Sequence, residues 1–165
     1  MISYKNKFNL RVLFWFLAIC TAVLIFFFSS QISEESTTVS NSVTAVIARI
    51  FVKNYDVMSE YDQYIVISSM NGFVRKAAHF SIYTVLAVFV TSALTTYPTL
   101  SIRLRAVYSI LLCTAYASSD ELHQYFVPGR SCELRDVFID ACGAVLGIFI
   151  VTAVMYFYRQ KKHNS

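Results

Sequence analysis

Residues 12–28, VLFWFLAICTAVLIFFF, form a long apolar run without a charged side chain. A helix of about this length crosses the hydrocarbon core of a bilayer. The run also exceeds the ~7–15 apolar residues at the centre of a secretory signal peptide, so we expect a retained membrane helix. Because lipid offers the backbone no hydrogen-bond partners, such a segment limits the chain to helices or closed barrels within the membrane.

The composition of the whole chain agrees with a membrane protein. Of its 165 residues, 56% are hydrophobic and only 15% are charged, whereas soluble domains carry about 25% charged residues. Three further apolar stretches follow the first, although polar residues occupy the outer ends of the middle two. The sequence predicts an all-α membrane protein with a single domain over residues 1–165, a bundle of four transmembrane helices at about residues 10–29, 73–96, 103–126 and 133–158.

Basic residues gather near the ends of the predicted spans. They precede the first span, occupy the connection between the second and third, and follow the last: Lys5, Lys7, Arg11, Arg103, Arg105, Arg159, Lys161 and Lys162. Four spans would place all three groups on one side of the membrane, and lysine and arginine near helix ends favour the cytoplasmic side. We therefore expect a multi-pass plasma-membrane protein with both termini in the cytoplasm.

The predicted outer loop, residues 30–72, has a pattern of its own. Apolar residues recur at helical spacing from Val39 to Phe51. A second apolar and aromatic patch follows from Tyr61 to Ile67. The first pattern predicts an amphipathic helical segment that lies on the membrane or caps the bundle.

Two classes of partner lack support in the sequence. The net charge is +4, yet no basic cluster typical of a nucleic-acid interface occurs. Three of the four cysteines fall within apolar segments, Cys132 stands in a loop, and there is no CxxC pair. We expect no nucleic-acid partner, no cofactor and no metal held by thiolates.

Polar residues recur on one face of each of three predicted spans. Residues three or four positions apart share a face of a helix. This relation groups Lys76, His79 and Tyr83 on the second span, Tyr116, Asp120 and Gln124 on the third, and Asp136, Asp140, Gly143 and Gly147 on the fourth. The two glycines have the GxxxG spacing that lets a neighbouring helix approach closely, so the acidic face should also be the packed face.

Three of these groups should lie at a common depth. With a rise of ~1.5 Å per residue, His79 and Asp120 lie about 9 Å below the outer end of their spans and Asp140 about 10 Å. Charged groups in lipid cost about 2.5 to 3.5 kcal/mol on insertion scales, so they should point inward and pair. We expect an outward-facing polar pocket with these cations and acids: Arg75, Lys76, Arg130, Arg135, Asp120, Glu121, Glu133, Asp136 and Asp140.

The same residues resemble the signature of the VanZ-like family. KAAHFSIY (76–83) resembles the family's K-x-x-H-F-x-x-Y, and DELHQYFVPGR (120–130) resembles its D-E-x-x-Q-x-F-x-P-x-R. The segment 136–147 is similar to D-x-x-x-N-x-x-G-x-x-x-G, and SSQ (29–31) resembles the polar signature after the first helix. The family usually has asparagine where this chain has Asp140, and the added carboxylate requires a retained proton or another cation.

The resemblance implies an integral membrane protein of the bacterial cell envelope. The family's namesake is associated with low-level resistance to teicoplanin, a glycopeptide antibiotic with a lipid tail. The implied partners are membrane lipids or lipid-linked envelope molecules. Pattern and resemblance together predict these ligand-binding residues: Lys76, His79, Tyr83, Asp120, Glu121, Gln124, Arg130, Asp136 and Asp140.

Two readings of the pocket do not involve catalysis. A binding module would hold an anionic group with Lys76 and Arg130, and Asp120 and Glu121 would balance those cations or accept hydrogen bonds from hydroxyl groups. A structural network of ion pairs would instead only fix the register of the helices. About ten polar residues converge at one place, which is more than helix register needs, so a functional pocket is favoured.

Two further readings give the pocket an activity. An enzyme would use His79 as general base, with Asp120 or Glu121 as the acid or the orienting group. A variant of this hypothesis holds a divalent metal with His79, Glu121 and Asp136. A transporter or proton relay would need polar groups near the midplane, and the inner half of the predicted bundle has few of them.

Overall fold

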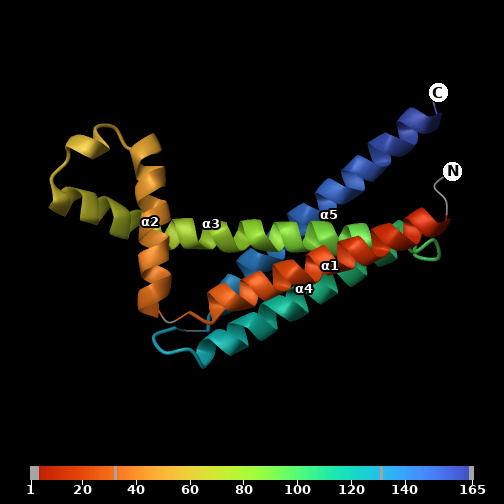
Figure 1. Ribbon diagram of the computed structural model, residues 1–165, viewed down its shortest axis with the longest axis horizontal. Helices are drawn as coiled ribbons and strands as arrows, with labels where there is room; N and C mark the ends of the chain where they lie inside the picture. The colour runs from red at the N-terminus through yellow and green to blue at the C-terminus, as the bar shows by residue number, and fades with distance from the viewer. Residues whose placement is uncertain (1–3, 32, 131, 164–165) are drawn as a thin grey trace.

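The computed structural model describes residues 4–31, 33–130 and 132–163, with side chains for 8–31, 37–130 and 132–161 (Figure 1). The described chain is helical and contains no strand, which confirms the all-α expectation. Its elements are α1 (Tyr4–Ser29), α2 (Ser33–Phe51), a short 3-10 turn η1 (Tyr55–Val57), α3 (Glu60–Thr95), α4 (Ile102–Tyr125) and α5 (Leu134–His163).

Helices α1, α3, α4 and α5 pack into a bundle, and α2 covers one end of it. Helix α3 is central, because it contacts α1, α4 and α5 and also carries α2. In Figure 1 α2 crosses α3 at a steep angle, near the end of α1 and the connection between α4 and α5. Both ends of the chain lie at the opposite end of the bundle.

The start of α3 differs from the sequence prediction. The span was expected to begin near Phe73, but the helix runs without a break from Glu60 and takes in the second aromatic patch. Ser59 caps it, since its hydroxyl accepts a hydrogen bond from the backbone N–H of Asp62 at 3.1 Å. Acidic residues in the first turn also favour helix initiation, and this capping signal in the sequence was overlooked.

The amphipathic helix predicted within the outer loop is present as α2. Thr44 and Ala48 are fully buried where α2 rests on α3. The side chain of Asn71 on α3 donates a hydrogen bond to that of Asn41 at 2.5 Å. The structure therefore shows this helix packed on α3 at one end of the bundle.

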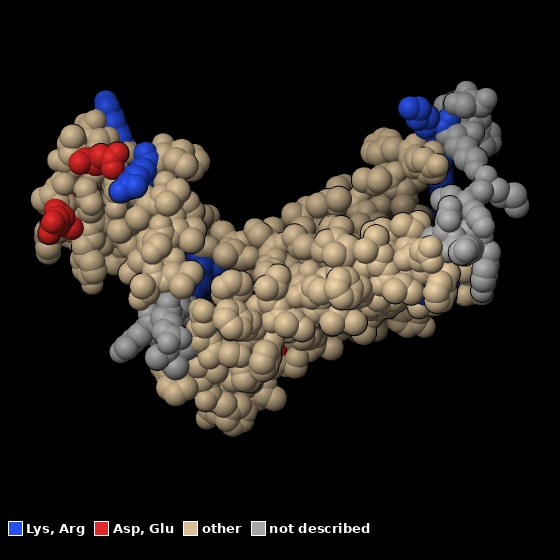
Figure 2. All heavy atoms as spheres, viewed as in Figure 1, with Lys and Arg blue, Asp and Glu red and all other residues tan. Residues whose placement is uncertain are grey.

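Three described helices are long and apolar enough to cross a membrane, namely α1, α3 and α5. Helix α4 is not among them, because Arg103 and Arg105 stand at its beginning and Asp120 and Glu121 near its end. Figure 2 shows charged side chains gathered at the two ends of the molecule, with the long middle section almost free of them. A helical membrane protein follows, whereas a count of four spans is not established.

The packing of α3 against α5 depends on two glycines. A Cβ atom on Gly143 would overlap the backbone oxygen of Phe80, and one on Gly147 would overlap the backbone oxygen of Thr84. The hydroxyl of Thr84 donates to the backbone oxygen of Gly143 at 3.0 Å. The close approach predicted from the GxxxG spacing is therefore confirmed, and it brings α5 near the polar face of α3.

Polar side chains also join α4 to its neighbours. The Tyr116 hydroxyl donates to the backbone oxygen of Ala22 on α1 at 2.6 Å, and the buried hydroxyl of Thr91 donates to that of Ser109 at 2.9 Å. Between helices in a membrane such bonds contribute about 0.6 kcal/mol each on average. They fix the register of α4 and hence the depth of the acids that it carries.

Candidate functional site

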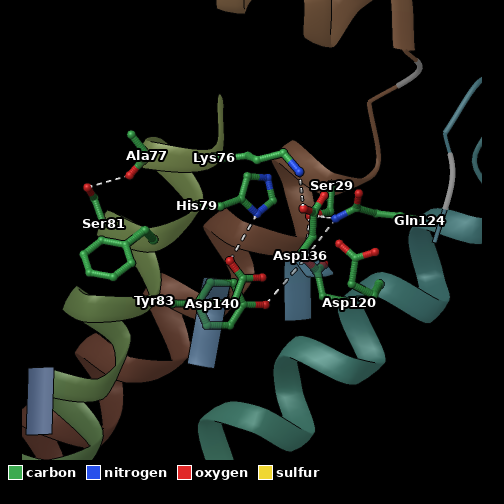
Figure 3. Close-up of polar contacts among 12 residues, drawn as sticks. Ser29, Lys76, Ala77, His79, Ser81, Tyr83, Asp120, Gln124, Asp136 and Asp140 are labelled. Atoms are coloured by element: carbon green, nitrogen blue, oxygen red, sulfur yellow. Dashed lines mark hydrogen bonds and ion pairs between the residues drawn. The ribbon is translucent and has the colours of Figure 1, made fainter. Parts of the chain in front are cut away.

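The predicted polar residues converge at the end of the bundle that α2 covers. Figure 3 shows His79 and Tyr83 from α3 facing side chains from the other helices of the bundle: Ser29 of α1, Asp120 and Gln124 of α4, and Asp136 and Asp140 of α5. The common depth predicted for His79, Asp120 and Asp140 agrees with this arrangement.

Asp120 accepts hydrogen bonds from three helices. One of its oxygens accepts from Ser29 Oγ at 2.9 Å, from Gln124 Nε2 at 3.2 Å and from the Tyr83 hydroxyl at 3.5 Å. Its other oxygen, Oδ1, has no hydrogen-bond partner among the described residues. The side chain is 4% exposed, so Asp120 is a buried hub that joins α1, α3 and α4.

Asp140 lies beside His79. The distance from His79 Nδ1 to Asp140 Oδ1 is 3.7 Å, which is an ion-pair contact and is too long for a good hydrogen bond. Asp140 is 1% exposed, and neither of its oxygens accepts a hydrogen bond from any described residue. His79 is therefore the neighbouring group that supplies the additional cation when its imidazole is protonated.

This arrangement corrects the expected partner of His79. The enzyme hypothesis used Asp120 or Glu121 to orient the imidazole, but the carboxylate in contact with it is Asp140. Helical periodicity places Asp120 and Asp140 on packed faces at similar depths, so sequence spacing alone could not decide between them.

Lys76 joins α3 to the start of α5. Its ammonium group lies 2.6 Å from Asp136 Oδ1 and 3.8 Å from Glu133 Oε2. The side chains of Lys76 and Asp136 are only 28% and 27% exposed. The predicted pairing of cations and acids between these helices is confirmed here, and it matches the charge of Lys76 with carboxylates.

Arg130 lies in the connection between α4 and α5 and makes a different set of contacts. Its guanidinium donates to the backbone oxygens of Gln31 and Phe28, both at 3.1 Å, and to Gln124 Oε1 at 3.0 Å. We expected Asp120 and Glu121 to balance this cation, but neither forms an ion pair with it in the described chain.

The electrostatic surroundings of Arg130 are therefore unusual. Burial lowers the pKa of its guanidinium, and the nearby positive charge of Arg75 lowers that pKa further. The side chain of Arg75 is exposed and has no ion pair or hydrogen bond with any other described residue. Two guanidinium groups thus share one region, and among the described side chains no carboxylate is bound directly to either.

Glu121 has a structural role. It is 2% exposed, and its Oε2 accepts a hydrogen bond from the backbone N–H of Glu133 at 3.0 Å, just before α5 begins. A carboxylate at the N-terminus of a helix satisfies a free donor and interacts favourably with the helix dipole. Glu121 therefore fixes the beginning of α5 and the loop that carries Arg130.

A polar cavity of about 110 Å³ lies among these groups. The charged and titratable side chains that line it are Arg75, Lys76, His79, Arg130, Glu133 and Asp136, and Gln124 completes its polar wall. Of the predicted ligand-binding residues, the structure thus places five at the cavity: Lys76, His79, Gln124, Arg130 and Asp136. The remaining four, Tyr83, Asp120, Glu121 and Asp140, are buried and support this wall from behind.

A second, apolar groove of about 230 Å³ adjoins the polar cavity. Its walls come from α1, α2 and α3, and they include Ile25, Val39, Val43, Val74, Ala78 and Ile82. Arg75, His79 and Arg130 line both spaces. The two therefore meet at a set of cationic and titratable side chains.

The metal variant of the enzyme hypothesis does not fit the geometry. In the part of the chain that is described, no three His, Cys, Asp or Glu side chains come close enough together to hold a metal ion. His79 pairs with Asp140, Glu121 binds the backbone of Glu133, and Asp136 pairs with Lys76. Each proposed ligand is thus engaged elsewhere.

Ser29 was missed as a member of the site. It is 2% exposed, and it binds both Asp120 and Gln124, the latter at 3.3 Å. The signal was available, because the triplet SSQ at 29–31 ends a long apolar run and follows it with hydroxyl and amide side chains. A buried carboxylate needs donors, and such a triplet supplies them.

Comparison with known proteins agrees with the resemblance seen in the motifs. Neither a search of curated proteins nor one of solved structures found a significant match. A family model described as VanZ/LLP1 matches residues 14–156, which covers most of the chain and every residue that lines the polar cavity. On this match and on the site it contains, the chain belongs to the VanZ/LLP1 family.

Proposed function

We propose that the polar cavity binds the anionic group of an amphiphilic molecule of the bacterial envelope, such as a lipid head group or a lipid-tailed compound. The observation that carries this proposal is the position of Arg75 and Arg130 at one cavity. Guanidinium groups bind phosphate and carboxylate through two parallel hydrogen bonds, which makes an anion the natural ligand of such a pair.

The charges around the cavity support an anionic ligand. Asp136 and Glu133 lie against Lys76, so those two acids and that cation form a local group. The acceptors of Arg130 among the described residues are neutral oxygens of Phe28, Gln31 and Gln124, which carry only partial charges. An anion between the two guanidinium groups would relieve their mutual repulsion and complete their hydrogen bonding.

The binding reading is favoured over catalysis by the same arrangement. Fixed cations line the cavity, whereas Asp120 and Glu121, two of the three candidate catalytic residues, are buried in structural hydrogen bonds. His79 alone of the three faces the cavity. A retained anion needs only fixed cations, and the cavity wall supplies them.

We further propose that four helices span the membrane, that both termini lie in the cytoplasm, and that the cavity opens on the outer side. Helix α4 has 24 residues, long enough at ~1.5 Å each to cross a core of about 30 Å. The polar ends of α4 contact the other helices, which reduces the free-energy cost of placing its charged side chains in the membrane. Those charges are the reason that α4 is less apolar than α1, α3 and α5. Arg11, Arg105 and Arg159 mark the end of the bundle that we assign to the cytoplasm.

The association of the family's namesake with glycopeptide resistance adds teicoplanin to the candidate ligands. Teicoplanin carries a lipid tail, and it therefore has the amphiphilic character that the two adjoining spaces would accommodate. A role of this chain in teicoplanin resistance would then follow from retention of the antibiotic at the membrane surface.

Binding of dodecyl phosphate to the purified protein in a maltoside detergent tests the proposal. We expect Arg130→Lys and Arg75→Gln each to weaken binding about tenfold, which corresponds to ~1.4 kcal/mol. Lysine keeps the charge but loses the planar two-point contact. The measurement is a titration followed by native mass spectrometry, with teicoplanin as a second probe.

Arg49→Gln is the matched control for this titration. Arg49 also lies near the outer end, but it pairs with Asp56 on the exposed surface and is not at the cavity. Its loss should leave the affinity unchanged. Equal affinities for the wild type and both cavity variants, or no binding of dodecyl phosphate at all, would contradict the proposed function.

A further inference from the structure

We infer that the ligand is a lipid with a hydrocarbon chain that lies in the groove between α1, α2 and α3, and that α2 forms one wall of this chain-binding site. The inference rests on the proposed function, because it starts from an anionic group held in the polar cavity. It adds the binding site of the ligand's hydrocarbon chain and a role for α2, the helix outside the bundle.

The first support is the continuity of the two spaces. Arg75, His79 and Arg130 belong to the walls of both, so a molecule whose anion contacts the guanidinium groups has its next atoms at the mouth of the groove. Beyond that mouth the walls are mostly apolar, with Val74, Ala78 and Ile82 on one side. A charged head attached to a hydrocarbon chain matches this order of polar and apolar surface.

The second support is the contrast with other hollows of the bundle. Two further apolar hollows lie beside Trp15, one against Leu111 and Ala115 and the other against Leu86 and Cys113. Neither has a charged side chain in its wall. Hollows of that kind suit any lipid tail of the surrounding bilayer, whereas the groove beside α2 ends at fixed cations.

The third support is the way α2 is held. Thr44 and Ala48 are buried against α3, and the hydrogen bond between Asn71 and Asn41 fixes the crossing point. On the same helix Val39 and Val43 line the groove, yet they remain 47% and 49% exposed. Helix α2 is not among the described helices able to span a membrane. A hydrocarbon chain lying in the groove would cover valines that the fold leaves exposed.

The test measures the binding of alkyl phosphates of increasing chain length to two variants in which phenylalanine replaces an alanine. Ala78→Phe places a large side chain in the groove, and Ala115→Phe places the same side chain in an uncharged hollow of the bundle. We expect Ala78→Phe to weaken dodecyl phosphate binding at least tenfold and butyl phosphate binding by less than twofold. Ala115→Phe should change neither affinity. Partition of the ligands into detergent affects wild type and variants alike, so it cancels in the ratio of their dissociation constants.

The outcomes separate this inference from the proposed function. If butyl and dodecyl phosphate both bind, both depend on Arg130, and Ala78→Phe affects neither, the anion site stands and the chain site is wrong. If Ala78→Phe and Ala115→Phe weaken dodecyl phosphate equally, the chain is held by the general apolar surface and the inference is also wrong. If no alkyl phosphate binds in any variant, the proposed function itself fails.

Discussion

Replacement of His79 by leucine should lower the free energy of unfolding by about 3 kcal/mol, because it leaves a buried carboxylate without its cation. Asp140 is 1% exposed, accepts no hydrogen bond from any described residue, and has His79 as its ion-pair partner at 3.7 Å. Thermal and denaturant unfolding in detergent measure the loss. At ~2–4 °C per kcal/mol for a chain of this size, the melting temperature should fall by roughly 6–12 °C.

A double-mutant cycle distinguishes this charge effect from simple loss of packing. Asp140→Asn alone should cost less than about 1 kcal/mol, since a neutral amide needs no cation. In the double variant His79→Leu, Asp140→Asn, much of the stability lost in His79→Leu should return. Additive losses in the double variant would show that the pair does not interact and that His79 only fills space.

The second large effect is expected at the contact between α3 and α5. Gly147→Ala should lower the free energy of unfolding by about 2–3 kcal/mol, the range for overpacking a well-packed contact. The new methyl group would overlap the backbone oxygen of Thr84 and approach the side chain of Ala87 to 2.9 Å. Separation of these helices would also displace Asp140 from His79, so binding at the cavity should weaken together with stability.

Gly72→Ala is the control for this substitution. Gly72 also lies within a helix, but a Cβ atom there meets nothing within 4 Å. Alanine is a better helix former than glycine by about 1 kcal/mol, so this variant should be as stable as the wild type or more so. Equal melting temperatures for Gly147→Ala and the wild type would contradict the close approach of the two helices.

Much of the fold could be predicted because long apolar runs and helical spacing are local properties. The run at 12–28 predicted α1, the spacing from Val39 to Phe51 predicted α2, and Gly143 with Gly147 predicted the packed face of α5. The beginning of α3 was wrong, since the prediction followed hydrophobicity and not the cap at Ser59. A helix can extend past the membrane, and hydrophobicity alone does not show where such an extension begins.

The site was predictable as a set of residues but not as a set of pairs. Periodicity assigns His79, Asp120 and Asp140 to packed faces, and all three lie together in the structure. It does not say which carboxylate meets the imidazole, because that depends on rotations and shifts of a few ångströms between helices. The contacts of Arg130 escaped prediction for a different reason: two of its acceptors are backbone oxygens, those of Phe28 and Gln31, which carry no signature in a sequence.

Asp140 is also the position at which this chain departs from the motif that it otherwise resembles. Its buried acid lies against a histidine that lines both the polar cavity and the groove. Protonation of His79 would then be tied to the charge of Asp140 as well as to that of a bound anion. The pair thus links the stability of the bundle to the wall of the proposed binding site.

Mapping where a bound amphiphile lies tests directly whether the polar cavity and the groove hold one ligand. Dodecyl phosphate with a photoreactive diazirine at the end of its chain should, on illumination, label the groove residues of α1, α2 and α3, including Val39, Val43 and Ile82, as read by mass spectrometry of peptides. Arg130→Lys should reduce that labelling. Labels concentrated at Leu111 and Leu112, or spread evenly over the apolar surface and unchanged by Arg130→Lys, would show that the ligand does not occupy the cavity and the groove.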